Sequence, residues 1–463
     1  MADDGSALPL VSINIDASPT GEPLELWRHA LGHGGVNPLP LPVRVIAGVR
    51  KLKPRLIRVF IQEFFTVYRG NGRFDWSRLD PYMDALRETG ARIVAAIAIK
   101  PKALFPAADQ AQCRPANVDE WQRVIAALAR RYSVERPLVT HWEIGNEPDI
   151  GEHGGCPYLI TDPEQYGEYY SMTVRPILDV CPQARVGGPA LANVHHDLLP
   201  GFLNYCRRTR SRLDFVSWHL YNSSPSAHAE KARFVRELLS PLPGPRPEMM
   251  VTEWNVGLGD AVSVEEQAFR ARRAALAAAG VLEMRDAGLD WSFYYHVWDQ
   301  TCFPADFAPF FSEPGVAGMV HHWNGAPHRL GLFGVCQEVR PQYFVYQMLA
   351  DLGDERLATQ CSGDVRAIAG RADGRVSIMA VSHCGGEAGD RVAIVKFSNL
   401  HLGPKRLTVR RIDDGRRWCP DTLELQPVEE RDVCTSSCFE CHVLLPADSV
   451  ALISLCDTEE TAH

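Results

Sequence analysis

The alternation of short β-rich runs with helical stretches is the feature that most constrains how this chain can fold. Eight runs have strand character: 10–16, 56–61, 92–99, 139–145, 184–190, 214–221, 248–254 and 289–298. Between them, stretches such as 77–90 place apolar residues at helical spacing. Near-continuous apolar strands joined by helices pair in parallel, buried on both faces. Because no glycine-rich turn follows the first run, as a doubly wound sheet would require, the count predicts an α/β fold, a (β/α)8 barrel over residues 1–353.

From residue 354 the pattern changes to short β runs without helices between them. Ala-Asp-Gly at 372–374 and Asp-Asp-Gly at 413–415 are typical hairpin turns between such runs. The sequence therefore predicts a second domain over residues 354–463, a C-terminal antiparallel β-sandwich.

Charge and hydropathy exclude several classes of partner. The 48 basic and 57 acidic side chains give a net charge of −9 and are mixed along the chain. A nucleic-acid partner would call for a basic stripe, so we expect none. No stretch is apolar for the 18 or so residues that a membrane span needs. The N-terminus lacks a signal peptide, so we expect a cytoplasmic protein, or a secreted or periplasmic one if a leader has been removed. The oligomeric state is left open.

The 13 cysteines are odd in number and scattered, which favours reduced thiols over a disulfide framework. Cys434, Cys438, Cys441 and His442 match both the C-x-x-C-H haem motif and an iron–sulfur spacing. Haem attachment needs export, and the cluster lies between β-like runs far from the residues discussed below. We interpret these cysteines as surface-loop residues, with a zinc or redox role as the alternative, and expect no cofactor and no metal.

Two glutamates end apolar runs at places where a barrel carries out chemistry. Glu147 follows the fourth run, where Pro148 turns the chain outward, and Glu253 ends the seventh. Active sites of such barrels lie at the carboxyl ends of the strands, so both acids should face one central cleft. Two facing carboxylates suit glycoside hydrolysis, in which one donates a proton and the other attacks the anomeric carbon. A structural salt bridge is the simpler alternative for either acid, but ionised groups are costly to bury.

"EIGNEPD" at 143–149, "DFVSWHLYN" at 214–222 and "MMVTEWN" at 249–255 together resemble clan A glycoside hydrolases, and most of all glycoside hydrolase family 39. That family holds β-xylosidases and α-L-iduronidases. The resemblance spans most of the barrel, and the appended sandwich fits it too. It implies a retaining glycosidase that acts by double displacement on a plant- or microbe-derived oligo- or polysaccharide, xylosidase-like or related.

Carried over to this chain, the resemblance makes Glu147 the general acid/base and Glu253 the nucleophile. Asn146 would hydrogen-bond the sugar 2-hydroxyl. Retention implies that the two carboxyls lie about 5–5.5 Å apart. Where many members have Trp-Asn-Glu-Pro, this chain has Gly145, which should open space beside the site.

Four more residues are candidates for substrate binding. His219 and Tyr221 end the sixth run on one face, and the resemblance implies that such a pair orients the nucleophile. Arg58 on the second run matches the clan's arginine near the nucleophile, so the resemblance implies that it would hold Glu253 ionised. The alternative is an interior salt bridge, which could be the same contact. Trp298, at the end of the eighth run, is a candidate sugar-stacking platform, with a core tryptophan as the alternative.

Lys100 and Lys102 stand two apart after the third run. They could pair with the carboxylate of a uronic acid, but two solvated loop lysines are the favoured interpretation.

Two other function classes stay open. In a non-catalytic carbohydrate-binding barrel both glutamates would be bystanders. A metal-dependent barrel hydrolase would need clustered His and Asp at strand ends, such as H-x-H after the first strand, and "SINIDAS" at 12–18 offers none.

Overall fold

The computed structural model describes residues 8–25, 29–242, 244–257, 270–325, 328–383, 389–415 and 418–458. The chain forms two compact units. One contains residues 1–26, 265–283 and 338–463, and the other contains residues 27–264 and 284–337. Each unit is described by itself below.

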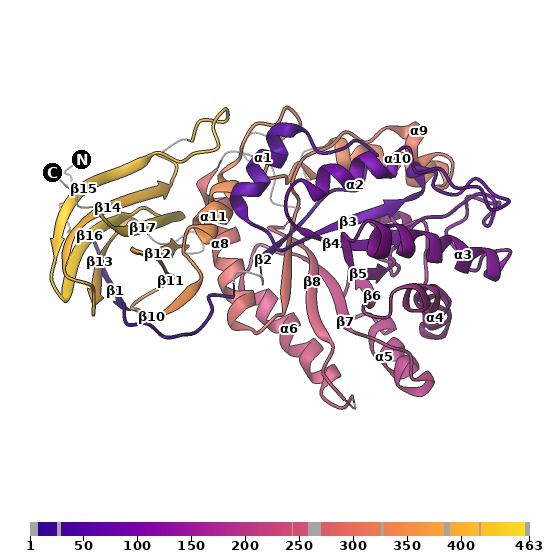
Figure 1. Ribbon diagram of the computed structural model, residues 1–463, viewed down its shortest axis with the longest axis horizontal. Coiled ribbons are helices and arrows are strands. Elements are labelled where there is room, and N and C mark those ends of the chain that lie inside the picture. Colours follow the sequence, from indigo (N-terminus) through magenta and orange to yellow (C-terminus); the bar gives the residue numbers. More distant parts are fainter. Residues whose placement is uncertain are drawn as a thin grey trace, which may run out of the picture. The chain divides into compact units, whose positions relative to one another are not determined.

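A closed barrel of eight parallel strands forms the second unit (Figure 1). Its strands are β2 (His29–Gly32), β3 (Leu56–Gln62), β4 (Arg92–Ala98), β5 (Val139–Ile144), β6 (Arg185–Leu191), β7 (Phe215–Tyr221), β8 (Glu248–Asn255) and β9 (Trp291–Tyr295). All seven residues of β3 are buried, as are six of seven in β4. This burial on both faces is what near-continuous apolar runs indicate, and it confirms the predicted barrel.

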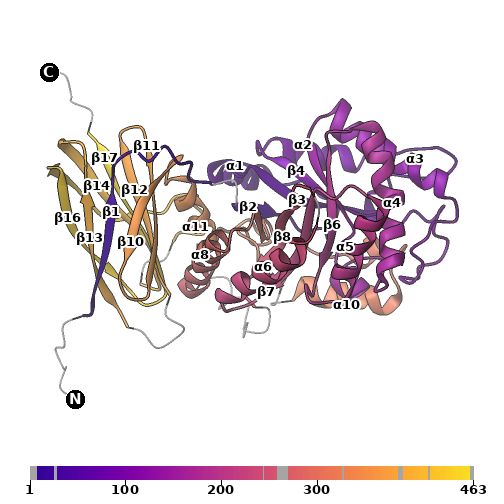
Figure 2. The same ribbon diagram turned by 90° about the horizontal axis from the view of Figure 1, so that it is seen from below.

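Helices connect the strands and cover the barrel (Figures 1 and 2). They are α1 (Val43–Leu52), α2 (Leu79–Arg87), α3 (Val118–Ala129), α4 (Pro163–Val180), α5 (Leu198–Thr209) and α6 (Ser226–Leu239), with α9 (Pro304–Phe307) and α10 (Glu313–Asn324) after β9 in the chain. Two further helices, α8 (Ala271–Asp286) for most of its length and α11 (Pro341–Ala350), belong to the first unit. Side-chain caps fix several starts: Asn117 accepts the backbone N–H of Glu120 at α3, and Asp162 accepts that of Gln165 at α4. The short turn η4 (Gly151–Gly154) follows β5 and becomes important at the site.

The strand expected to open the barrel is the main correction to the sequence analysis. Residues 10–16 form β1 (Leu10–Asp16), which pairs with β10 and β13 of the other unit's sheet, as Figure 2 shows. The barrel instead begins with the four-residue β2. Buried and less buried residues alternate along β1, unlike the barrel strands. That period-two pattern is typical of a strand with one buried face, so residues 1–353 do not all belong with the barrel.

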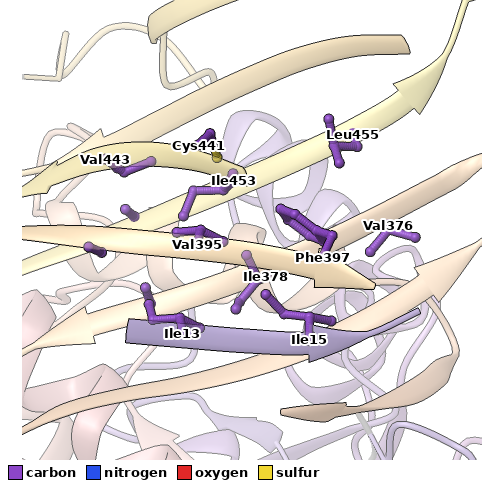
Figure 3. Close-up of a cluster of buried hydrophobic side chains, with 14 of the residues drawn as sticks. Ile13, Ile15, Val376, Ile378, Val395, Phe397, Cys441, Val443, Ile453 and Leu455 are labelled. Atoms are coloured by element: carbon purple, nitrogen blue, oxygen red, sulfur yellow. The ribbon is translucent and has the colours of Figure 1, made fainter. Parts of the chain in front are cut away.

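The sheet of the first unit has nine strands in the order β15-β14-β17-β12-β11-β10-β1-β13-β16. Besides β1 they are β10 (Glu355–Cys361), β11 (Val365–Ala372), β12 (Arg375–Ser382), β13 (Arg391–Ser398), β14 (Gly403–Ile412), β15 (Pro427–Thr435), β16 (Cys438–Leu445) and β17 (Ser449–Asp457). All pairings are antiparallel except β1 with β13. Inward side chains such as Ile13, Ile378, Phe397 and Ile453 form one core (Figure 3), which confirms the predicted sandwich.

The cysteine cluster lies on strands rather than in a loop. Cys434 is on β15 and exposed, while Cys438 and Cys441 are on β16. Cys441 is buried in the sandwich core, whereas Cys438 and His442 are exposed. The thiols of the described cysteines are free. Among the residues that the structure describes, no helix combines the length and apolar character needed to cross a membrane.

Candidate active site

A cavity of 720 Å³ opens at the carboxyl ends of the barrel strands. Each of the eight strands, or the segment that follows it, contributes to its wall. The wall includes Gly35, Phe60, Gln62, Gln110, Glu147, Ile150, Glu152, His153, Gly154, Gly155, Ala192, Leu220, Tyr221, Glu253, Tyr295, Ser312, Met319, His322, Trp323 and His328. Both predicted acids therefore face this cavity, at the barrel end where chemistry is expected.

Glu147 reaches the cavity because the chain turns sharply after β5. Gly145 and Glu147 have positive φ angles of 94° and 42°. The backbone N–H of Glu147 donates to the Ala190 carbonyl, next to the end of β6. A Cβ added to Gly145 would meet nothing within 4 Å, in line with the open space expected there, and its φ favours glycine.

The two acids lie close together. The Nδ1 atom of His219 is 2.8 Å from Oε1 of Glu147 and 3.6 Å from Oε2 of Glu253. One oxygen of each carboxylate lies within 4.8 Å of the other. This separation fits the close spacing that a shared substrate atom requires.

Arg58 binds Glu253 and connects it to its neighbours. Its guanidinium donates from Nη1 to Oε1 of Glu253 at 2.7 Å and from Nε to Oε2 of Glu143 at 2.5 Å. The remaining Nη2 donates to Oδ1 of Asn146 at 2.7 Å. Arg58 and Glu143 are fully buried. The two alternatives raised for Arg58 are therefore one contact, and Glu143 is a buried partner of the same guanidinium.

Local interactions distinguish the two carboxylates. The Tyr221 hydroxyl donates to Oε2 of Glu253 at 2.6 Å. Burial raises the pKa of Glu253, and Arg58 and Tyr221 oppose that rise by stabilising the ionised form. Burial and the charge of Glu253 raise the pKa of Glu147 well above its usual range. This arrangement favours a protonated Glu147 beside an ionised Glu253.

His219 differs from its expected role. It was expected to orient Glu253 together with Tyr221, but its Nδ1 lies closer to Glu147. Burial, and then the charge of Arg58, lower the pKa of His219 well below its usual range. The imidazole is therefore neutral, and it can accept the Glu147 carboxyl proton or donate to the ionised carboxylate.

Replacing Arg58 should destabilise the fold. In Arg58→Met the buried carboxyls of Glu143 and Glu253 lose their cation, and we expect unfolding to become easier by about 3–5 kcal/mol. Chemical denaturation at neutral pH measures this loss. Arg69→Met removes an ion pair with Asp75 whose arginine side chain is 56% exposed, so it should cost at most about 1 kcal/mol. Similar losses in both variants would contradict the assignment.

The remaining candidates are placed as follows. Asn146 is 2% exposed and its Nδ2 donates to the Gly154 carbonyl at 3.0 Å; its contact with a substrate hydroxyl stays a prediction. Trp298 is buried, its ring 6.5 Å from that of His33, and the cavity wall does not include it. These observations favour a core tryptophan over a sugar-stacking platform. The half-buried Trp323 of α10 lines the cavity instead.

Sequence reasoning missed the wall made by α10. It comes from the segment between β9 and α11, which has no strand pattern and little helical amphipathicity to mark it as part of a site. The rings of Tyr295, His296 and His328 lie 5.6–5.7 Å from that of Trp323 and hold it in place. The presence of several histidines and one tryptophan in residues 321–328 was the available signal.

The lysine hypothesis is not supported. Lys100 is 2% exposed, and its Nζ donates to the carbonyls of Asp109 and Pro157. Its backbone N–H donates to Glu63, a carboxyl whose pKa burial raises to about 8. Lys100 therefore stabilises loops below the surface and is neither a solvated lysine nor a ligand for a uronic acid.

Glu147, His219 and Glu253 are the one group of acidic, histidine or cysteine side chains within the described residues whose atoms are near enough to share a metal ion. The guanidinium of Arg58 already contacts Glu253 and would repel a divalent cation at this position. The first barrel strand is β2, so "SINIDAS" was the wrong place to look for metal ligands. The observed group still does not favour a metal-dependent hydrolase.

A family model for glycosyl hydrolases family 39 matches residues 13–387. The chain belongs to this family. The β-xylosidase of Geobacillus stearothermophilus is 24% identical over 265 residues, which cover 52% of this chain and 48% of that protein. The alignments thus span about half the length of the curated relatives matched.

Solved structures support the same fold for this family 39 chain. The GH39 enzyme from Xanthomonas axonopodis pv. citri superposes with a TM-score of 0.77 at 20% identity, covering 99% of this chain and 100% of that one. A monomeric β-xylosidase from Caulobacter crescentus gives 0.75 at 21% identity, covering 97% and 99%. At 20% and 21% identity, the similarity to these structures shows a shared fold.

Proposed function

We propose that this protein is a retaining glycoside hydrolase, with Glu253 as nucleophile and Glu147 as general acid/base. The observation that carries the proposal is the pair of buried carboxylates in the cavity, one bound by Arg58 and Tyr221 and the other by neither. Family membership supports it independently.

The different surroundings assign the roles. Glu253 attacks the anomeric carbon because Arg58 and Tyr221 keep its carboxylate ionised and oriented. Glu147 protonates the leaving oxygen because its raised pKa keeps a proton available. After the aglycone leaves, the same carboxylate takes a proton from water, which attacks the glycosyl-enzyme. Two displacements restore the original configuration, and the short distance between the acids supports this course.

The substrate we propose is a xyloside or related glycoside in an oligo- or polysaccharide. The relatives named above include β-xylosidases.

Two experiments test the proposal. Aryl glycosides of xylose, arabinose, galactose, glucose and glucuronic acid identify the sugar by their relative kcat/KM values. A 2-deoxy-2-fluoro glycoside of the preferred sugar should label Glu253 covalently, as peptide mass spectrometry would show. A non-catalytic carbohydrate-binding barrel, the second candidate, would bind sugars without hydrolysis or labelling.

The pH profile tests the hydrogen bond from Tyr221. In Tyr221→Phe the ionised Glu253 loses a donor, so its pKa rises and the acidic limb of kcat/KM moves to higher pH. A hydrogen bond to a charged group is worth about 1.5–3 kcal/mol, and one pKa unit is about 1.4 kcal/mol, so a shift of about one to two units is expected. An unmoved acidic limb would show that Glu253 is not the group that titrates there.

A further inference from the structure

The turn η4 folds back onto Glu147. The carbonyl of Glu147 accepts the backbone N–H of Gly151 at 2.9 Å, so the turn begins directly beside the acid. The Gly154 carbonyl accepts Nδ2 of Asn146, and the Gly155 carbonyl accepts Nε2 of Gln62. These bonds tie both ends of the turn to the floor of the cavity.

Gly154 touches the Glu147 side chain directly. A Cβ added to Gly154 would lie 2.0 Å from Oε2, 2.7 Å from Cβ and 3.0 Å from Cδ of Glu147. The clash thus involves the base of the side chain as well as its tip, and a rotation of the carboxyl alone would not relieve it. On the other side, Oε1 of Glu147 is fixed by His219. The carboxyl is therefore confined between an imidazole and a bare glycine Cα.

The turn is also anchored to the wall of the cavity. The Glu152 carboxylate accepts both the backbone N–H and the hydroxyl of Ser312, the N-cap of α10. Gly315 of α10 packs against the same carboxylate, because a Cβ there would lie 2.2 Å from Oε2 of Glu152. Gln110 accepts the backbone N–H of Glu152. Glu152, at 5% exposure, is thus a buried link between η4 and α10.

We propose that Gly154 is a positioning residue for the acid/base: its missing side chain, with η4 anchored to α10 by Glu152, fixes the carboxyl of Glu147 at the leaving oxygen. This inference rests on the proposed function. It assigns a role to a residue that has no reacting group of its own but determines where the proton is delivered.

The test is the dependence of Gly154→Ala on the leaving group. A displaced acid should matter for poor leaving groups, which need protonation, and little for 2,4-dinitrophenol, which does not. A displacement of about 1 Å costs on the order of 10²-fold. We therefore expect a loss of that order in kcat/KM for an alkyl or 4-methylphenyl glycoside and a much smaller one for the dinitrophenyl glycoside.

Gly318→Ala is the matched control. It adds the same methyl group to the cavity wall, where it would meet nothing within 4 Å. Any effect on binding should be equal for all leaving groups. Glu152→Ala releases the anchor without crowding Glu147 and should reproduce the leaving-group dependence of Gly154→Ala more weakly.

Labelling by the 2-fluoro dinitrophenyl glycoside completes the test, since it needs Glu253 but no acid. Gly154→Ala should be labelled at the wild-type rate. The proposal would be overturned if Gly154→Ala were not labelled. It would also be overturned if the variant lost kcat/KM equally for all leaving groups, or lost none for any of them. A wild-type protein that neither hydrolyses nor becomes labelled would instead overturn the proposed function.

Discussion

Glu253→Ala is expected to abolish turnover of every glycoside, whatever its leaving group. Without a carboxylate no glycosyl-enzyme can form, and removal of an enzyme nucleophile typically costs on the order of 10⁴–10⁶-fold in kcat. The loss should show in steady-state assays with the dinitrophenyl and alkyl glycosides alike. The substitution also leaves a small space beside Arg58 and Tyr221, where the proposed mechanism places the anomeric carbon.

External azide should partly restore Glu253→Ala by entering that space. A single displacement then gives a glycosyl azide of inverted configuration, which proton NMR identifies by its anomeric coupling. Glu248→Ala is a matched control, since Glu248 opens the same strand at the opposite end of the barrel and pairs with Arg185. It should turn over substrate normally. Undiminished activity in Glu253→Ala would exclude Glu253 as the nucleophile.

The barrel could be predicted from the sequence because its signals are local. Seven of the eight predicted strands are barrel strands, since long apolar runs separated by helices leave few alternatives. The remaining barrel strand, β2, was missed because it has only four residues, His29–Gly32, which are too few to show a periodic pattern. The run at 10–16 replaced it in the count, although its alternating burial is that of a sandwich strand. The predicted number of barrel strands was therefore right although the first predicted strand was wrong, and the positions assigned to the later strands around the barrel were unaffected.

The acids could be predicted for a related reason. In a barrel, the carboxyl ends of all strands lie around the same cleft, so Glu147 and Glu253 could be placed there without any knowledge of side-chain contacts. The contacts themselves could not be predicted. His219 lies nearer Glu147 than Glu253. The pairing of β7 with β8 shifts register between Trp218 and His219, and the hydrophobic pattern of the sequence does not predict such an irregularity.

The elements least accessible to sequence reasoning are those that enclose the site. Trp323 and Ser312 belong to a segment after the last barrel strand whose path depends on tertiary contacts, such as the bond between Ser312 and Glu152. Gly154 has no motif either. Its importance depends on a distance to Glu147 that exists only in the folded chain.

Glu147→Ala should separate the two steps of the reaction, in contrast to Glu253→Ala. General acid catalysis contributes about 10²–10⁴-fold, so kcat/KM for an alkyl glycoside should fall by that order. The dinitrophenyl glycoside should keep most of its kcat/KM, because dinitrophenolate leaves without a proton. Its kcat should fall, since water now attacks the glycosyl-enzyme without a base. A burst of dinitrophenol in stopped-flow absorbance would show that the intermediate accumulates.

Azide distinguishes the roles of the two acids. In Glu147→Ala it needs no base to attack the glycosyl-enzyme, so it should raise kcat for the dinitrophenyl glycoside. The product forms by two displacements and should therefore be the azide of retained configuration. Because Arg58 and Tyr221 contact Glu253 and not Glu147, this variant keeps its nucleophile ionised and oriented. If Glu147→Ala gave the inverted azide and Glu253→Ala the retained one, the roles assigned here would have to be exchanged.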